Sequence, residues 1–189
     1  MFKQATTTRV AAFFADGLEE CEALVVCDLL YRSGIPCDKV SITDNLAVVS
    51  SHEVTVVCDR SLTDEDFSFD SYDLLFLPGG MPGTKNLRAC KPLCEAASSF
   101  VASGRTVAAV CAAPSILAKL GLLEGRRATA NPGFQGVLAD HGATVSQDAG
   151  NLVTSQGLGT CIELGLTLVR RILGGDAVRA CGDQIVYTR

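Results

Sequence analysis

The chain alternates short apolar runs with longer segments whose apolar residues recur at helical spacing. Residues 9–15 (RVAAFFA) and 73–77 (DLLFL) are almost continuously apolar, as in strands buried on both faces. Residues 20–34 (ECEALVVCDLLYRSG) and 161–173 (CIELGLTLVRRIL) each have one apolar face at helical periodicity. Strands alternating with helices of about ten to fifteen residues are typical of βαβ units, which build a mainly parallel sheet with helices on both faces.

The remaining segments continue the same alternation. Further strands are expected at 37–43, 53–58, 105–110, 127–130 and 151–157, and further helices at about 88–103 and 114–123. No linker, repeat or low-complexity tract separates them, and 189 residues suffice for one domain with a substantial core. We therefore predict one domain over residues 1–189, of the α/β class, with a flavodoxin-like, doubly wound, mainly parallel sheet.

Charge and hydropathy exclude two classes of partner. The formal net charge is −5 and the basic residues are scattered, whereas binding to a phosphate backbone requires a concentrated basic face. Charges, Gly or Pro interrupt each apolar stretch before it reaches membrane-spanning length, and the start MFKQATTTRV lacks the apolar core of a signal peptide. We expect a cytoplasmic protein whose principal partner is neither nucleic acid nor a membrane.

Nine cysteines stand at irregular spacing, and their pattern bears on disulfides and metals. Their number is odd, no C-x-x-C occurs, and the chain has no sign of secretion, so a disulfide framework is not expected. Cys90 and Cys94 are four residues apart, but neither His52 nor His141 stands at ligand spacing from them. We expect mostly reduced thiols, no metal site and no cofactor.

Functional sites in open parallel sheets form at the carboxyl ends of the strands, where the strand-to-helix turns emerge. Four such turns carry glycines or reactive side chains: DGLEECE after the first strand, PGGMPG after DLLFL, Cys111 after TVAAV, and SQGLGT after the late strand. They are far apart in the sequence, but the predicted topology brings them to one edge of the sheet.

Cys111 stands where the strand 105–110 turns into a helix that has Pro114 near its first turn. Small neighbours such as Ala112 suit a nucleophile elbow, although the flanking glycines of G-x-S-x-G are missing. A helix start favours thiolate over thiol, which predicts a lowered pKa for Cys111. The alternative on this local pattern is a buried cysteine that packs under the helix.

Three glutamates crowd the start of the first helix in GLEECEAL. Acids there complement the helix dipole, an ordinary role that suits Glu19 and Glu20. Glu22 falls instead beside the apolar positions of the helix, so we expect a partly buried carboxyl that retains its proton. Such a carboxyl would donate a hydrogen bond to the Cys111 thiolate, and the two groups would titrate as a coupled pair.

The two glycines of LPGG, Gly79 and Gly80, allow the backbone to approach a ligand closely and to turn N–H groups toward it. Together with the N–H of Ala112, these groups could form an oxyanion hole. The alternative for this stretch is a plain tight turn.

Four stretches, GLEECEAL, YDLLFLPGGMPGTKNL, AAVCAAPSILAKLGLLEGRRAT and TSQGLGT, together resemble the DJ-1/ThiJ/PfpI superfamily, specifically its DJ-1-like branch. The resemblance runs nearly end to end. It implies a flavodoxin-like homodimer in which Cys111 is the reactive cysteine, Glu22 is the acid that touches it, and the backbone of Gly80 and Ala112 lines the site. Activities assigned to family members include glyoxalase action on methylglyoxal, repair of glycated adducts, oxidative-stress sensing and chaperone activity.

This chain departs from the family pattern at two positions. The protease-like branch has a histidine directly after the nucleophilic cysteine, where this chain has Ala112, so cysteine-peptidase and amidotransferase chemistry are not expected. Several DJ-1-like relatives have a histidine near Asn131; without it, proton transfer would rest on Glu22. Gly79 and Asn131 are the candidate substrate-lining residues, and His52 could reach a site across a dimer interface.

The sequence therefore predicts a cysteine-dependent enzyme acting on small reactive carbonyls, of the cofactor-independent glyoxalase or protein-deglycase type. Methylglyoxal or an early glycation adduct would be the substrate and Cys111 the nucleophile. The alternative is an oxidative-stress sensor or redox-dependent chaperone in which the same thiol is oxidised to a sulfinate. A nucleotide-binding flavodoxin relative is disfavoured, because neither PGGMPG nor QGLGT matches a dinucleotide-binding or P-loop motif.

Overall fold

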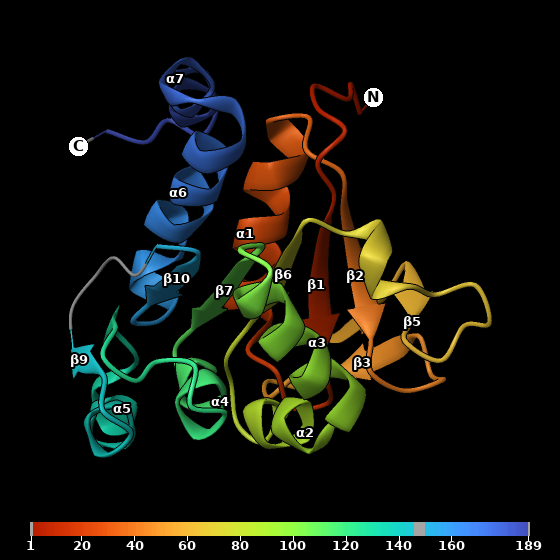
Figure 1. The fold of residues 1–189 in the computed structure, drawn as a ribbon. Helices are drawn as coiled ribbons and strands as arrows, with labels where there is room; N and C mark the ends of the chain where they lie inside the picture. Colours follow the sequence, from red (N-terminus) through yellow and green to blue (C-terminus); the bar gives the residue numbers. More distant parts are fainter. Residues whose placement is uncertain (1, 146–149, 189) are drawn as a thin grey trace.

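A six-stranded sheet lies at the centre of the computed structural model, which describes residues 2–145 and 150–188 (Figure 1). Its strands run in the order β10 (Leu152–Ser155), β7 (Thr106–Val110), β6 (Leu74–Leu77), β1 (Val10–Phe14), β2 (Cys37–Ser41) and β5 (Arg60–Ser61). Every neighbouring pair in this sheet is parallel. The predicted α/β class and the mainly parallel, flavodoxin-like sheet are confirmed.

The central strand β1 shows why the sheet is covered on both faces. All five of its residues are buried, and they alternate between two apolar clusters. Val10, Ala12 and Phe14 pack on one face, whereas Ala11 and Phe13 pack on the other. Successive side chains of a strand point to opposite faces, so an apolar strand is buried only between two layers.

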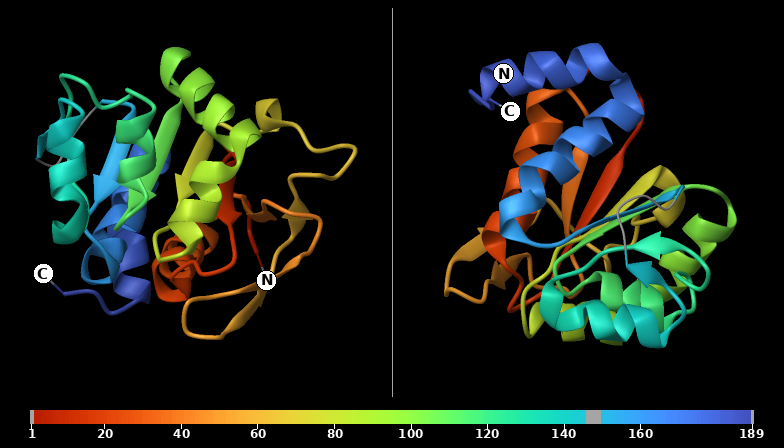
Figure 2. Two further views of the ribbon diagram at one scale, coloured as in Figure 1. Left: turned by 90° about the horizontal axis from the view of Figure 1, so that it is seen from below. Right: turned by 90° about the vertical axis from the view of Figure 1, so that its left-hand side faces the viewer.

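Helices form a layer on each face of the sheet (Figure 2). The helices α1 (Glu20–Arg32) and α6 (Cys161–Leu173) pack together on the face that receives Val10 and Phe14, and α7 (Gly175–Gln184) follows α6. The opposite face is covered by α2 (Gly83–Ala89), α3 (Lys91–Ala102) and α4 (Pro114–Lys119), with α5 (Gln135–Asp140) beside α4. Helices therefore lie on both faces, as predicted.

Smaller elements lie outside the central sheet. The strands β3 (Ala47–Val49) and β4 (Thr55–Val57) form an antiparallel pair, and β8 (Arg127–Ala128) pairs in parallel with β9 (Thr144–Val145). Short 3-10 turns occupy η1 (Phe69–Ser71), η2 (Pro132–Phe134) and η3 (Leu158–Thr160). The strand expected at 53–58 is thus shorter than predicted and belongs to the exposed β3–β4 pair.

Two predicted helices differ from those observed. The helix expected at about 88–103 is two helices, because Cys90 adopts an extended conformation (φ −77°, ψ 92°) between α2 and α3. Pro92 lies in the first turn of α3, where its missing N–H is tolerated, so it suits the start of a new helix better than the interior of one long helix. The helix expected at 114–123 ends at Lys119, shortly before Gly121, whose φ is +72°. The helices α5 and α7 were not predicted.

Among the described residues, none of the helices combines the length and apolarity that crossing a membrane requires.

Gly165 allows α6 to approach α1, the helix that carries Glu22. An ideal Cβ at Gly165 would lie 2.4 Å from Leu29 Cδ1 and 3.2 Å from Leu29 Cβ. We expect Gly165→Val to lower the free energy of unfolding by about 1–3 kcal/mol, because overpacking forces side chains and backbone to shift. Urea denaturation would measure this effect.

Gly182 on α7 provides the matched control, because a Cβ there meets no heavy atom within 4 Å. Gly182→Val should change the free energy of unfolding by no more than about 0.5 kcal/mol. Equal stability losses in the two variants would show that the close approach of α6 to α1 does not depend on glycine.

Candidate functional site

The chain bends sharply at Cys111, between β7 and α4. The residue has a φ of +61°, a left-handed conformation that is uncommon for residues with a side chain. Two hydrogen bonds hold it there: its N–H donates to the Ser155 carbonyl (3.1 Å), and its carbonyl accepts from the Asn131 N–H (2.9 Å). Strain of this kind persists where the surroundings impose it, typically at functional sites. The predicted elbow is present, and it holds a half-buried Cys111 at the carboxyl end of β7.

Glu22 meets Cys111 across Gly79. Glu22 lies in the first turn of α1 with only 3 % of its surface exposed, and its N–H donates to the side chain of Glu19, the N-cap. An ideal Cβ at Gly79 would lie 2.5 Å from Cys111 Cβ and 2.5 Å from Glu22 Oε2. Only a residue without a side chain therefore fits between the two functional groups.

Gly80 supplies the second half of this turn and fixes it against the start of α1. Its φ is +90°, and an ideal Cβ there would lie 2.2 Å from the Glu19 nitrogen and 2.5 Å from the Leu18 carbonyl carbon. The Glu19 N–H donates to the Gly79 carbonyl (3.0 Å), which ties the two turns together. Backbone N–H groups of Gly80 and Ala112 face the Cys111 sulfur and favour its ionised form.

Burial and Glu22 control the pKa of Cys111. Burial raises that pKa to about 11, the charge of Glu22 and its hydrogen bond to the thiol act in the same direction, and the N–H groups of Gly80 and Ala112 oppose them. Burial also raises the pKa of Glu22, as predicted, while the Cys111 thiol and the N–H groups of Gly79 and Leu158 favour the ionised carboxylate. The two groups are therefore coupled.

Magnitudes decide which member of the pair holds the proton at rest. The ordinary pKa values are 9.0 for the thiol and 4.5 for the carboxyl, so the intrinsic preference for a proton on sulfur is about 6 kcal/mol. Burial penalises both ions, and each of them receives two backbone N–H groups. We therefore expect the resting pair to be a thiol beside a carboxylate.

The predicted lowering of the Cys111 pKa is therefore wrong in direction, whereas the predicted rise of the Glu22 pKa agrees with the burial of that carboxyl. One reason is the length of α4, which has only six residues and begins with Pro114, a residue without an N–H, so its dipole is weak. The other reason is the carboxylate itself, whose charge opposes a second negative charge nearby. A carboxylate that faces a thiol is a group able to accept its proton.

A fourth turn, between β10 and α6, completes the site. An ideal Cβ at Gly157 would lie 3.6 Å from Glu22 Oε1 and 4.0 Å from Asn131 Nδ2. The adjacent Leu158 N–H faces Glu22. The sequence predicts the SQGLGT turn at this edge but does not identify Gly157 or Leu158 as site residues. The pair of glycines after a strand is the sequence feature that could have indicated them. Asn131 does lie at the site, where its Oδ1 accepts a hydrogen bond from the Gly133 N–H (3.1 Å).

Oε2 of Glu22 is the side-chain atom of this site that lacks a hydrogen-bond partner among the described residues. It is also buried. An unpaired buried carboxylate oxygen is costly, and such atoms in native proteins commonly serve a ligand, an ordered water or a catalytic step. The atom therefore points to proton exchange at this position.

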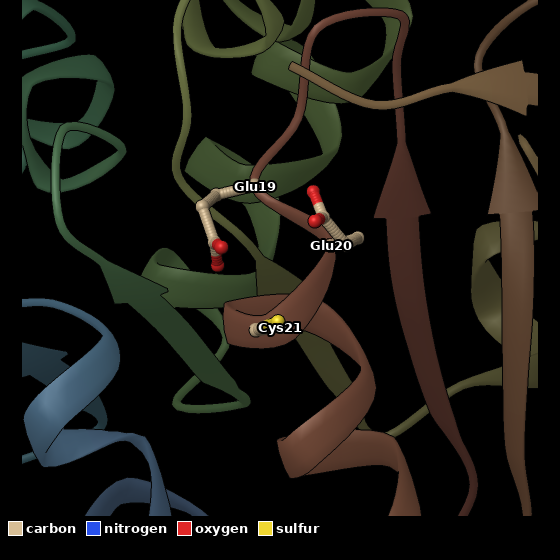
Figure 3. Close-up of side chains that lie close together, drawn as sticks. All are labelled: Glu19, Glu20 and Cys21. Atoms are coloured by element: carbon tan, nitrogen blue, oxygen red, sulfur yellow. The ribbon is translucent and has the colours of Figure 1, made fainter. Parts of the chain in front are cut away.

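Glu19, Glu20 and Cys21 lie together at the start of α1, with their donor atoms within 4.8 Å of one another (Figure 3). Glu19 caps the helix, and Glu20 contacts His52 Nδ1 at 3.1 Å. These contacts agree with the ordinary role predicted for the two acids at a helix start. The exposed His52 side chain contacts Glu19 and Glu20 of its own chain.

The pKa alone does not distinguish Cys111 from the other cysteines. Burial raises the pKa of Cys58 to about 12 and that of Cys161 to about 12. Cys111 differs in geometry, because only this cysteine among the described residues combines a left-handed backbone with a facing carboxylate and two facing N–H groups.

Comparison with known proteins agrees with this geometry. The chain is 36 % identical over 187 residues to Protein DJ-1 homolog B of Arabidopsis thaliana, which covers 96 % of this chain and 42 % of that protein. The chain thus spans less than half the length of that relative. It is 28 % identical over 184 residues to the Glutathione-independent glyoxalase DJ-1 of Schizosaccharomyces pombe, covering 91 % and 95 % of the two chains.

The fold also matches a solved structure of oxidized Toxoplasma gondii DJ-1, with a TM-score of 0.88 and 28 % identity over 96 % of this chain and all of that one. A model of the DJ-1/PfpI family matches residues 8–171. With the elbow, the facing carboxylate and these likenesses together, the chain belongs to the DJ-1/PfpI family and to its DJ-1-like branch.

Proposed function

We propose that this protein is a cofactor-independent enzyme that converts small dicarbonyls such as methylglyoxal to hydroxy acids, with Cys111 as its nucleophile. The observation that carries the proposal is the backbone of Cys111, which is held at φ +61° so that the sulfur faces a buried carboxylate. The name of the Schizosaccharomyces pombe relative, a glutathione-independent glyoxalase, supports this choice of substrate.

The first step joins the enzyme to the aldehyde. Cys111 sulfur attacks the aldehyde carbon of methylglyoxal while its proton passes to Glu22, so that a carbon–sulfur bond forms and the carbonyl becomes an oxyanion. The N–H groups of Gly80 and Ala112, which face the sulfur, are available to that oxyanion. Protonation of the oxyanion by Glu22 gives a hemithioacetal and restores the carboxylate.

The second step moves hydrogen between adjacent carbons. The Glu22 carboxylate removes the proton from the former aldehyde carbon and returns it to the former ketone carbon, while the hydroxyl proton on the first carbon's oxygen passes to the oxygen of the second carbon. The first carbon is thereby oxidised to a thioester and the second is reduced to an alcohol. Water then hydrolyses the thioester to lactate and regenerates the Cys111 thiol. The sum is methylglyoxal plus water giving lactate, without an external oxidant or reductant.

Lactate formation from methylglyoxal without glutathione tests the proposal. We expect turnover by the purified protein, and mass spectrometry of acid-quenched enzyme should find the methylglyoxal adduct on the peptide that contains Cys111. Absence of lactate, or an adduct spread evenly over the nine cysteines, would contradict the proposed function.

Gly79→Ala should move the Cys111 thiol and the Glu22 carboxylate out of contact with each other. Its Cβ would displace Cys111, Glu22 or both, since either lies 2.5 Å away, and a displacement of about 1 Å costs on the order of a hundredfold in rate. We therefore expect kcat/KM for methylglyoxal to fall about a hundredfold, with circular dichroism unchanged. Gly133→Ala is the control, because its Cβ would meet only Asn131 Oδ1 at 3.5 Å; an equal loss there would refute the steric explanation.

Oxidative-stress sensing is the second candidate function for the same thiol. A sulfinate at Cys111 would accept hydrogen bonds from the N–H groups of Gly80 and Ala112 and from a protonated Glu22. Intact-mass analysis after graded peroxide separates the two functions. Addition of two oxygen atoms at Cys111 with negligible lactate formation would favour the sensor, whereas turnover before oxidation favours the enzyme.

We also propose that the protein forms a homodimer. Large apolar side chains are exposed on α1 and on the β3–β4 pair, among them Leu24, Tyr31, Val49 and Val57. Exposed apolar residues grouped on neighbouring elements are typical of a self-association surface. Sedimentation equilibrium should give twice the chain mass of 19.8 kDa, and a monomer at micromolar concentration would contradict this proposal.

A further inference from the structure

A second pair of thiols lies away from Cys111, between the outer helix layer and the sheet. Cys27 in the middle of α1 and Cys37 at the start of β2 face one another, with 3.9 Å between their sulfur atoms. Both residues are half-buried, and both line a surface pocket of about 320 Å³ together with Lys39 and Asp28. The pocket wall also includes Leu24 and Tyr31, which belong to the surface proposed for the homodimer, so the pair is preformed and is open to solvent in the single subunit.

The distance between the sulfurs matches two ligands of one metal ion. Two metal–sulfur bonds of about 2.3 Å place their sulfurs at most about 4.6 Å apart, when they are collinear, and closer when the angle at the metal bends. A disulfide has a sulfur–sulfur bond of about 2.05 Å, so the two side chains would have to approach by almost 2 Å to form one. The observed 3.9 Å accommodates a bridging cation without such a movement.

The donor set restricts which cation fits. Over residues 2–145 and 150–188, no third Cys, His, Asp or Glu donor atom joins Cys27 and Cys37 within 4.8 Å. Asp28, which also lines the pocket, is bound to Arg32 at 2.6 Å. Structural zinc requires four protein ligands, and this pocket offers two. Two soft thiolates with few other donors favour Cu(I) among the common biological metals.

Charge also favours a monovalent ion. Two thiolates and one Cu⁺ leave a net charge of −1, and the Lys39 ammonium, another residue of the pocket wall, carries the balancing positive charge. Burial lowers the pKa of Lys39, but the hydrogen bond from its Nζ to Asp59 (2.6 Å) outweighs burial, and Cys27 and Cys37 add to the rise. The lysine therefore remains protonated beside the two sulfurs.

We propose that Cys27 and Cys37 form a Cu(I)-binding site that is separate from the Cys111 site. Binding replaces two thiol protons: Cu⁺ and two thiols give a bis-thiolate Cu(I) complex and two protons, with no change in oxidation state. The hydrogen bond to Cys27 and burial raise the pKa of Cys37 well above its ordinary value, so a cation that binds here must displace a proton from that thiol.

Anaerobic titration with Cu(I), buffered by a chromophoric Cu(I) chelator, tests the site on the full chain. After one equivalent of Cu(I), alkylation with N-ethylmaleimide and peptide mass spectrometry would report which of the nine cysteines are protected. We expect protection of Cys27 and Cys37 together. Cys27→Ser and Cys37→Ser should each weaken the highest-affinity Cu(I) binding by at least about a hundredfold, because a hydroxyl is a poor ligand for Cu(I).

Cys94→Ser is the matched control, since Cys94 is a half-buried thiol on α3, outside this pocket, and should leave that affinity unchanged. Equal affinity in wild type and Cys27→Ser, or protection of other cysteines in place of this pair, would overturn the proposal. So would a disulfide between residues 27 and 37 in the metal-treated sample. Lactate formation is measured separately, so failure of the copper site and failure of the proposed enzyme activity are distinguishable.

Discussion

Cys111→Ser should abolish lactate formation from methylglyoxal, lowering kcat/KM by at least about a thousandfold. Serine keeps the size and the strained backbone position of the residue, but a hydroxyl is far harder to ionise than a thiol, and Glu22 is too weak a base to compensate. Steady-state lactate production without glutathione measures the loss, and circular dichroism checks that the fold is kept.

Cys94→Ser is the control for Cys111→Ser, because it makes the same chemical change at a half-buried cysteine on α3. Its kcat/KM should stay within about twofold of wild type. Substantial activity in Cys111→Ser, or an equal loss in both variants, would show that Cys111 is not the nucleophile.

Glu22→Gln should have two opposite effects. It should lower kcat by about a hundredfold or more, because glutamine cannot accept the thiol proton or transfer hydrogen between the substrate carbons. It should also speed alkylation of Cys111 near neutral pH, because the charge that raises the pKa of the thiol is gone. A purely structural role for Glu22 would slow turnover without accelerating alkylation.

Glu20→Gln is the control for Glu22→Gln. Glu20 lies two residues earlier on α1 and contacts the exposed His52, so the same loss of one carboxylate occurs at the same helix start. Both its turnover and its rate of Cys111 alkylation should stay within about twofold of wild type. If Glu20→Gln reproduced both effects, general electrostatics of the helix start would explain them.

The sheet was predictable because its strands are apolar on both faces. Runs such as DLLFL have few alternatives to burial between two helix layers, and the helical spacing in 161–173 matches α6 residue for residue. The missed helices lack such a pattern: α7 (GDAVRACGDQ) has two glycines and little apolar surface. This helix packs against α6, and that tertiary contact cannot be predicted from the residues of α7 alone.

The meeting of the site residues at one edge was predictable from topology, but the rise in the pKa of Cys111 was not. Cys111, Glu22, Gly79, Gly80, Ala112 and Asn131 all lie at one edge of the sheet because parallel strands end there. The balance of charge between Cys111 and Glu22 depends on depth of burial and on the length of α4, both of which are tertiary outcomes. Gly157 was missed for the same reason, since its nearness to Glu22 arises only when β10 joins β7.

The pH dependence of Cys111 alkylation in wild type and Glu22→Gln, followed peptide by peptide with iodoacetamide, tests most directly whether the resting proton sits on sulfur under the control of Glu22. If the proton sits on sulfur, the midpoint of the alkylation rate against pH in the wild type lies above the ordinary thiol pKa of 9.0. Loss of the carboxylate charge in Glu22→Gln then shifts this midpoint to lower pH. A wild-type midpoint below pH 7 that stays the same or rises in Glu22→Gln would contradict this, and would mean that the protein rests with a thiolate at position 111 and the proton on the carboxyl group.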